Sequence, residues 1–278
     1  MEWKLADRTL DLSSPIAAGI VNVTTDSMFS GARSGTPEQA VADGVELAAA
    51  GFGMLDVGAV AAKAGPPVGV AEEAAALVPT VEGLVLQTDL PVSADTFSPE
   101  VAELALAKGA AAVNDISGGG AKMFDVVAAS GCGYVLMHIE GPPRVDREWR
   151  SYDDLVEHLL AWFAARVELA VEHGVAREQI AIDPGLDFDL SPEQDLEILR
   201  RLGELRALEL PLYVSLSRKD FIGAVLAGSW EERWPAERRE WGTVAAVTLA
   251  VRAGADVLRI HDRSSLQAMR VAELITHG

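Results

Sequence analysis

The sequence lacks the features that mark secreted, membrane-bound or disulfide-stabilised proteins. Cys132 is the only cysteine among 278 residues, so no disulfide can form within the chain. No apolar run approaches the roughly 18 residues of a membrane helix, and residues 1–10 carry charges where a secretion signal would be apolar. We therefore expect a cytoplasmic protein that engages no membrane.

Positive charge and aromatic residues are also scarce. Lys and Arg total 23 against 42 Asp and Glu, which gives a formal net charge of −19 and would repel a nucleic-acid backbone. The acidity predicts a well-solvated surface and no nucleic-acid partner. Aromatic residues make up 6% of the chain and apolar residues 49%, so Ala, Val and Leu must build most of the core.

Short apolar runs alternate with longer segments of helical period, a pattern typical of repeated β-strand and α-helix units around a parallel sheet. A chain of this length fits one α/β barrel, and we predict a single-domain (β/α)₈ TIM barrel. The eight predicted strands are Ile16–Val21, Met54–Val57, Pro91–Ala94, Ala111–Val113, Tyr134–Met137, Ile180–Ile182, Leu212–Val214 and Val257–Ile260.

Capping signals support the helices between these strands. Thr36 and Ser98 each precede a proline and then a glutamate, which is the signature of a helix start. Glycines follow four helical runs just before a strand, as helix C-terminal glycines do: Gly51, Gly109, Gly174 and Gly254. His158 and His173 fall in the helical stretch Asp153–Gly174, where placement on the surface accounts for both.

Every predicted strand ends on a polar residue. In such a barrel the chemistry lies at the carboxyl ends of the strands, so these residues are candidates for a shared site. One aspartate or asparagine at such a position usually caps a loop, but eight polar ends together favour a binding pocket. They are Asn22, Asp56, Asp95, Asn114 with Asp115, His138, Asp183, Ser215 with Ser217, and Arg259 with His261.

The chemistry of these residues predicts two kinds of ligand group. Aspartate and asparagine acceptors suit a flat heterocycle rich in N–H donors, while Lys219, Arg259 and His261 are expected to supply positive charge for an anion. The run from Ser217 to Lys219 follows the seventh strand, where such barrels often bind phosphate. Arg259 and His261 are two residues apart, so both side chains can leave one face of the strand.

Several motifs, in order along the chain, resemble the signatures of the dihydropteroate synthases. The resemblance covers nearly the whole chain, and we interpret residues 1–278 as a single pterin-binding (β/α)₈ barrel domain. The motifs are Gly19-Ile20-Val21-Asn22-Val23-Thr24 with Asp26-Ser27, Ser93-Ala94-Asp95-Thr96, Asn114-Asp115-Ile116-Ser117-Gly118, Met137-His138, Asp183-Pro184-Gly185, Ser217-Arg218-Lys219 with Ile222-Gly223, and Arg259-Ile260-His261-Asp262.

The resemblance implies a transferase of folate biosynthesis that acts as a homodimer. Such an enzyme condenses 6-hydroxymethyl-7,8-dihydropterin pyrophosphate with p-aminobenzoate, giving 7,8-dihydropteroate and pyrophosphate, and Mg²⁺ assists the departure of pyrophosphate. Asp95 and Lys219 are the implied catalytic residues, and Asn22 is the implied metal ligand. The matched positions that should bind pterin are Asp95, Asn114, Asp183, Phe188 and Lys219, and those for pyrophosphate are Asn22, Lys63, Arg259 and His261.

The chain departs from the family pattern in two loops. After the second strand, Ala61 and Ala62 replace hydroxyl-bearing residues, and Lys63 stands for an arginine and cannot make a planar two-point contact with phosphate. In the first loop, Met28 and Phe29 stand where the family has phenylalanine and serine, and we expect them near the acceptor amine.

Asp220 is the third departure, at a position that is usually Ser or Arg in the family and that meets the carboxylate of p-aminobenzoate. With Ser217 it belongs to the expected acceptor site, where its charge would repel a second carboxylate. The alternative interpretation is that Asp220 caps the helix that begins at Phe221. Because these changes all fall on the acceptor half and the pyrophosphate loop, insensitivity to sulfonamides is a further hypothesis.

Two rival functions keep the pterin pocket. One is a divergent paralogue that uses another amine acceptor or lacks synthase activity, as Asp220 and Ala62 would allow. The other is a pterin or folate carrier without a covalent step, which would have no use for a pyrophosphate site at Lys219, Arg259 and His261.

Overall fold

The computed structural model describes residues 1–23, 34–63, 65, 67–145 and 147–277. Strands and helices alternate after a short N-terminal hairpin. In chain order the elements are β1 Glu2–Lys4, β2 Thr9–Asp11, β3 Ile16–Asn22, α1 Pro37–Ala50, β4 Met54–Gly58, α2 Val70–Gln87, β5 Val92–Asp95, α3 Pro99–Leu106, β6 Ala112–Asp115, α4 Ala121–Ser130, β7 Gly133–Met137, α5 Leu155–Glu172, β8 Ile180–Asp183, α6 Pro192–Arg201, β9 Tyr213–Ser215, α7 Asp220–Ala227, α8 Glu240–Arg252, β10 Val257–Ile260 and α9 Arg263–His277.

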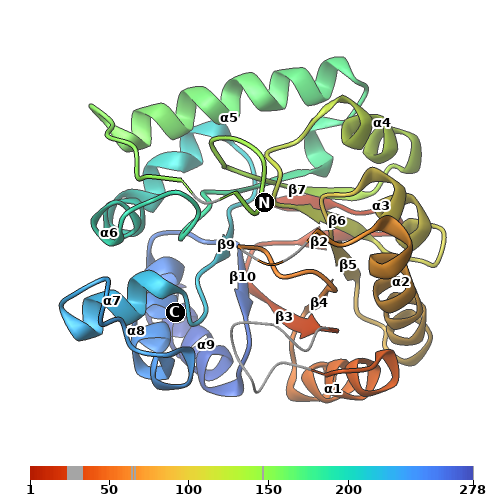
Figure 1. Cartoon of the computed structure of the whole chain (residues 1–278), viewed down its shortest axis with the longest axis horizontal. Helices are drawn as coiled ribbons and strands as arrows, with labels where there is room; N and C mark the ends of the chain where they lie inside the picture. Colours follow the sequence, from red (N-terminus) through yellow and green to blue (C-terminus); the bar gives the residue numbers. More distant parts are fainter. Residues whose placement is uncertain (24–33, 64, 66, 146, 278) are drawn as a thin grey trace.

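Strands β3 to β10 form one parallel sheet that closes on itself, in the order β8-β7-β6-β5-β4-β3-β10-β9. The two end strands meet where Ile182 of β8 bridges Leu212, next to β9, and donates its N–H to the Pro211 carbonyl at 2.9 Å. Helices lie around these strands (Figure 1). The predicted (β/α)₈ TIM barrel is confirmed.

The local signals in the sequence act as expected. All eight predicted strands are present, each within two residues of its predicted ends. Thr36 and Ser98 cap α1 and α3 by accepting the N–H of Gln39 and of Val101, each at 3.3 Å. Each of the four predicted C-terminal glycines has a φ between 92° and 98°, a left-handed conformation that favours glycine.

The antiparallel hairpin of β1 and β2 is absent from the sequence prediction. Trp3 at its centre is fully buried, and its indole N–H donates to the Gln179 carbonyl at 2.7 Å, just before β8. Trp3 packs with Ala18, Met54 and Tyr213, which lie near the amino-terminal ends of β3, β4 and β9. The hairpin therefore covers the end of the barrel opposite the polar strand ends.

Because all eight strands of the barrel are parallel, their carboxyl ends share one rim. The polar residues that close the strands are thereby brought together from positions up to 239 residues apart, as Asn22 and His261 are. In the part of the chain that the structure describes, no helix is long and apolar enough to cross a membrane.

Trp3→Ala should lower the free energy of unfolding by about 3–5 kcal/mol, the usual cost of truncating a buried aromatic side chain. Urea denaturation followed by circular dichroism measures the change. Leu86→Ala is the control, because that side chain is 79% exposed and its truncation should cost less than about 0.5 kcal/mol. Equal losses in the two variants would show that the hairpin contributes nothing to barrel stability.

Candidate active site at the carboxyl rim of the barrel

A pocket of about 330 Å³ lies at the carboxyl rim, within the range of small-molecule sites. Most candidate residues that the structure describes line it, and they come from seven different strand ends or the loops after them, whereas the strand-end residues Asp56, Asp115 and His138 are not part of its lining. Met28 and Phe29 lie outside the described residues. The predicted residues that line the pocket are Asn22, Lys63, Asp95, Asn114, Asp183, Phe188, Ser217, Lys219, Asp220, Arg259 and His261.

The floor of the pocket is built around one guanidinium that two carboxylates share. Arg259 of β10 donates through Nε to Asp56 at 2.5 Å and through Nη2 to Asp95 at 2.7 Å. Asp56 of β4 is fully buried and also accepts hydrogen bonds from Ser93 and, at 3.1 Å, from the Asn114 amide. Arg259 therefore lines the pocket together with His261 and also binds two carboxylates of the floor, which the spacing of Arg259 and His261 did not indicate.

One cation cannot neutralise two buried carboxylates. Burial raises the pKa of Asp95 to about 7, although the Arg259 charge acts in the opposite direction. Asp56 and Glu73 add to the rise because like charges disfavour a further one. The floor can thus hold one more positive charge, and Asp95 can exchange a proton near neutral pH.

Asp183 of β8 and Lys219 form the second polar pair of the pocket. Burial raises the pKa of Asp183 to about 6 against the opposing charge of Lys219, and burial lowers the pKa of Lys219. The Lys219 ammonium donates to the Leu186 carbonyl at 2.6 Å and lies 4.6 Å from the centre of the Phe188 ring. This corner offers acceptors, a donor and an aromatic face to a planar ligand.

His261 is placed in the pocket as predicted, but it does not supply the expected positive charge. Its Nδ1 lies 2.9 Å from the Ser217 hydroxyl. Burial and the nearby Arg259 charge lower the pKa of His261 to about 3, so the imidazole is neutral at physiological pH. It can exchange hydrogen bonds with a ligand, while Arg259 and Lys219 carry the positive charge.

Arg218 is buried and joins the loops after β9 and β10. Its side chain contacts Asp262 at 3.0 Å and donates to the Ala236 carbonyl at 3.0 Å, and its own N–H donates to the Thr243 hydroxyl at 3.0 Å. These contacts hold the loop that carries Ser217 and Lys219. Arg218 therefore positions the pocket wall.

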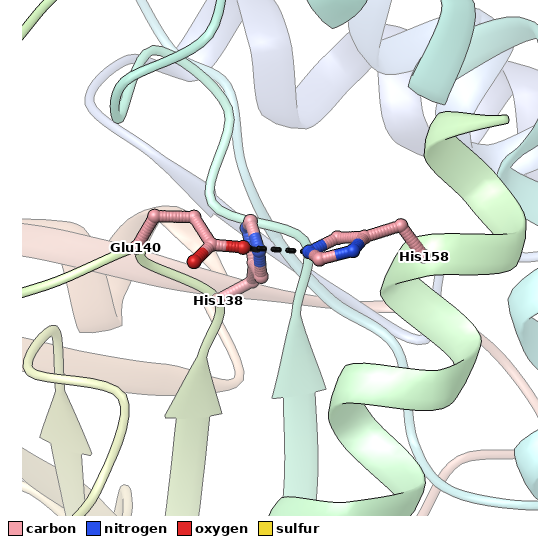
Figure 2. A group of neighbouring side chains, drawn as sticks. All are labelled: His138, Glu140 and His158. Carbon is pink, nitrogen blue, oxygen red and sulfur yellow. Dashed lines mark hydrogen bonds and ion pairs between the residues drawn. The ribbon is translucent and has the colours of Figure 1, made fainter. Parts of the chain in front are cut away.

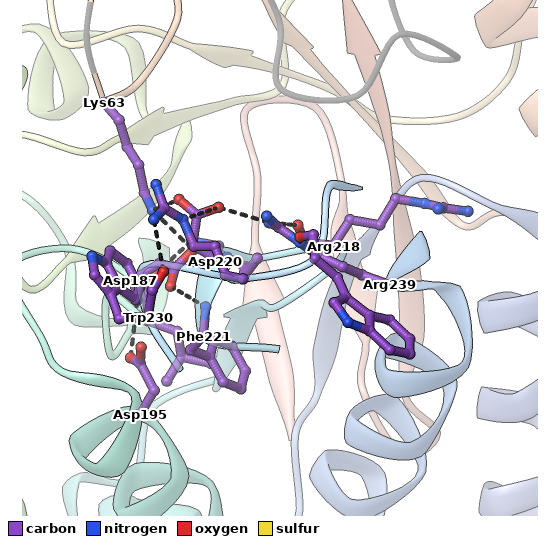
Figure 3. Close-up of polar contacts among 12 residues, drawn as sticks. Lys63, Asp187, Asp195, Arg218, Asp220, Phe221, Trp230 and Arg239 are labelled. Atoms are coloured by element: carbon purple, nitrogen blue, oxygen red, sulfur yellow. Dashed lines mark hydrogen bonds and ion pairs between the residues drawn. The ribbon is translucent and has the colours of Figure 1, made fainter. Parts of the chain in front are cut away.

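The helix-capping interpretation of Asp220 is wrong. Asp187 accepts the N–H groups of Asp220 and, at 2.9 Å, of Phe221, so Asp187 caps α7. The Asp220 carboxylate instead contacts Lys63 at 3.0 Å and Arg239 at 2.7 Å (Figure 3). The sequence around α7 does not reveal this cap, because Asp187 lies 33 residues before Asp220, in the loop after β8.

Around Asp220, cations outnumber the carboxylates that they contact. Lys63 contacts both Asp187 and Asp220, and Arg233 lies 3.5 Å from Asp220. With Arg239 this makes three cations for two carboxylates. Although burial opposes ionisation, the charges of Lys63 and Arg239 lower the pKa of Asp220 to about 2. Burial raises the pKa of Asp195, which accepts the N–H of Asp187, well above its usual value.

Oxygen donors that suit Mg²⁺ flank Gly58 at the end of β4. A Cβ at this glycine would lie 3.5 Å from the Asn22 amide oxygen and 3.2 Å from an Asp95 oxygen. Mg²⁺ prefers a few such ligands and keeps waters or phosphate oxygens in its other positions. Asn22 and Asp95 fit that requirement together with a phosphate-bearing ligand.

A second hollow, of about 600 Å³, lies between α6, α7 and α8. It is larger than the pocket at the rim, but its lining is almost entirely apolar, with only Arg200 and Arg252 charged. Convergent polar groups are what a catalytic pocket needs. The rim pocket is therefore the site of chemistry.

The chain as a whole is similar to proteins of one family. Residues 18–261 match the family of pterin binding enzymes. The dihydropteroate synthase of Synechocystis sp. is 36% identical over 92% of this chain and 89% of its own length. The dihydropteroate synthase of Yersinia pestis, solved with a sulfonamide drug, has a TM-score of 0.92 at 32% identity, with 99% and 98% of the two chains covered.

A third relative is solved with a reaction product. The dihydropteroate synthase of Xanthomonas albilineans in complex with 7,8-dihydropteroate is 35% identical to this chain, with a TM-score of 0.84 and 100% and 99% of the two chains covered.

The raised pKa of Asp95 predicts a pH-dependent contribution to stability. The folded state holds the Asp95 proton more tightly than the unfolded state, so this contribution is present below the ordinary value of 3.8 and is lost as pH rises to about 7. The free energy of unfolding of the wild type relative to Asp95→Asn should fall across that window. Urea denaturation at a series of pH values measures it.

Asp183→Asn is the control for this experiment, since burial raises the pKa of Asp183 to about 6 only. The free energy of unfolding of the wild type relative to Asp183→Asn should therefore stop falling at a lower pH than the value relative to Asp95→Asn. A stability difference between wild type and Asp95→Asn that stays constant or increases with pH would contradict the assignment.

Proposed function

The chain belongs to the dihydropteroate synthase family of pterin-binding enzymes, which are transferases, and from this we propose the reaction it catalyses. It condenses 6-hydroxymethyl-7,8-dihydropterin pyrophosphate with p-aminobenzoate to give 7,8-dihydropteroate and pyrophosphate. The observation that carries the proposal is the rim pocket, where buried carboxylates and a shared Arg259 lie beside a lysine and an aromatic ring.

Pterin binding would use the corner of Asp183, Asn114 and Lys219. The ring N–H and amino groups of a pterin are donors, and a buried carboxylate pairs well with two adjacent donors. Lys219 would donate to a ring acceptor, while Phe188 would supply a face for stacking. The hydrogen bond from Asn114 to Asp56 orients the Asn114 side chain before a ligand arrives.

The pyrophosphate would lie toward Asn22, Arg259 and His261. Mg²⁺ held by Asn22 and by phosphate oxygens would neutralise charge on the leaving group. Arg259 supplies positive charge from the protein, and the neutral imidazole of His261 donates a hydrogen bond. Lys63 is engaged by Asp187 and Asp220, so contact with pyrophosphate would require it to exchange one of these partners.

Asp95 would stabilise the charge that develops when pyrophosphate leaves. Breaking the C–O bond before the amine attacks leaves a cationic pterin methylene, and the floor of the pocket holds two carboxylates for one guanidinium. A positive charge placed there favours the ionised form of Asp95. A single preorganised group of this kind contributes roughly 3 kcal/mol to catalysis.

The p-aminobenzoate carboxylate would be accepted near Asp220 despite the like charge. Three cations contact two carboxylates in this cluster, so cations outnumber the carboxylates they contact. Repulsion by Asp220 is thereby reduced but not removed, which keeps a divergent paralogue with another amine acceptor as the second candidate. The same feature supports reduced sensitivity to sulfonamides, which carry the aniline group of p-aminobenzoate.

We also propose a cytoplasmic homodimer. Support comes from exposed apolar side chains beside the hollow between α6, α7 and α8, where a second copy could pack. Val225 and Leu249 are 50% and 57% exposed, and Trp241 on the same helix as Leu249 is 78% exposed.

The direct test is to incubate the purified chain with the dihydropterin pyrophosphate, Mg²⁺ and p-aminobenzoate and to follow 7,8-dihydropteroate by mass spectrometry. We expect product, with kcat/KM lowered about a hundredfold or more in Asp95→Asn. Lys219→Ala should weaken pterin binding by about 10- to 100-fold, the cost of losing a charged hydrogen bond. Pterin binding without product in the wild type would favour the paralogue instead.

Asp220→Asn tests the acceptor site separately. Removing the carboxylate raises the positive charge of the cluster, so KM for p-aminobenzoate and the inhibition constant of sulfamethoxazole should both fall severalfold, with KM for the pterin substrate unchanged. Steady-state kinetics measures all three. Potent inhibition of the wild type by sulfamethoxazole would refute the hypothesis of sulfonamide insensitivity.

A further inference from the structure

Three side chains of types that can bind a metal ion lie close together outside the pterin pocket. His138 directly follows β7, Glu140 lies two residues later, and His158 projects from α5 toward both (Figure 2). One donor atom from each lies within 4.8 Å of the other two. His158 lies 20 positions after His138 in sequence, in a helical stretch where placement on the surface was the expectation.

Some buried polar atoms in and beside this cluster have no hydrogen-bond partner in the described part of the chain. His138 is 1% exposed, and neither of its ring nitrogens has a hydrogen-bond partner among the described residues. Its Nε2 lies 3.4 Å from a Glu140 oxygen without forming a hydrogen bond. The hydroxyl of Tyr152, whose ring centre is 4.8 Å from that of His158, is also buried and unpaired within the described part of the chain. Buried polar groups left this way cost free energy.

The geometry favours one ion between the three side chains. The Nε2 atoms of His158 and His138 lie 2.6 Å and 3.4 Å from the same Glu140 oxygen. Ligands of a tetrahedral Zn²⁺ lie roughly 3.3 Å apart, given bonds of about 2 Å. Small side-chain rotations would therefore bring the three donors to an ion.

The donor set selects the class of metal. Two imidazoles and one carboxylate suit Zn²⁺ and its neighbours Co²⁺, Ni²⁺ and Cu²⁺, whereas Mg²⁺ prefers oxygen ligands alone. We propose that His138, Glu140 and His158 form a Zn²⁺ site distinct from the pterin pocket, with water as the fourth ligand. The site follows from these residues alone and does not depend on the proposed reaction.

Such an ion would join the segment after β7 to helix α5. Met137 lines the pterin pocket, and the N–H of His138 donates to the Asp183 carbonyl at 2.8 Å. Fixing His138 would therefore also hold two strand ends that shape the pocket. The role is structural, since the bound ion takes part in no bond change.

The test is a zinc titration of the full chain. Chelator-treated protein in excess Mg²⁺ is titrated with zinc chloride by calorimetry, and zinc retained after gel filtration is measured by mass spectrometry. We expect one Zn²⁺ per chain and a higher melting temperature on binding. His158→Ala should bind Zn²⁺ at least about a hundredfold more weakly. Removing even a residue that only hydrogen-bonds to a metal ligand lowers metal affinity about 10- to 100-fold.

His173→Ala is the matched control. His173 ends the same helical segment and contacts Asp125 at 2.8 Å, but it has no part in the cluster, so this variant should bind zinc as the wild type does. Glu140→Gln keeps a hydrogen-bonding side chain while it removes the charge, and it should also weaken binding. The proposal is overturned if the wild type retains no zinc, or if His158→Ala and Glu140→Gln bind it as tightly as His173→Ala.

Discussion

The shared guanidinium of Arg259 is the interaction on which the active site depends. It reaches from β10 past β3 to carboxylates on β4 and β5, so it can form only when the sheet curves and the register of these strands is correct. With one cation between two buried carboxylates, the floor has a deficit of positive charge. Burial raises the pKa of Asp95, the neighbouring carboxylates add to the rise, and the deficit favours the binding of a cationic group. Orientation of Asn114 through Asp56 follows from the same cluster.

The side of the pocket around Asp220 has the opposite balance of charge. Lys63, Arg233 and Arg239 outnumber the carboxylates they contact, so this side favours an anion. In the proposed reaction, the cationic methylene of the pterin would fit the floor, and the carboxylate of p-aminobenzoate would fit the side around Asp220. The two clusters would thereby favour opposite charges in two parts of the pocket.

The strand ends were predictable from sequence because apolar runs and capping residues are local signals. Asp95, Asn114 and Arg259 could be placed at one rim for that reason, since a parallel barrel brings all carboxyl ends together. The partners of these residues were not predictable. The contact of Arg259 with Asp56 depends on the directions of side chains across the barrel. The capping of α7 by Asp187 depends on two loops that come together only in the folded chain. The N-terminal hairpin was missed because three-residue strands carry little periodicity.

The hairpin that covers the amino-terminal end of the barrel affects how ligands reach the pocket. Within the described residues, Trp3 and its neighbours fill that end, whereas the pocket lies at the carboxyl rim. In the proposed reaction, both substrates and both products would therefore have to pass through the same opening at the rim.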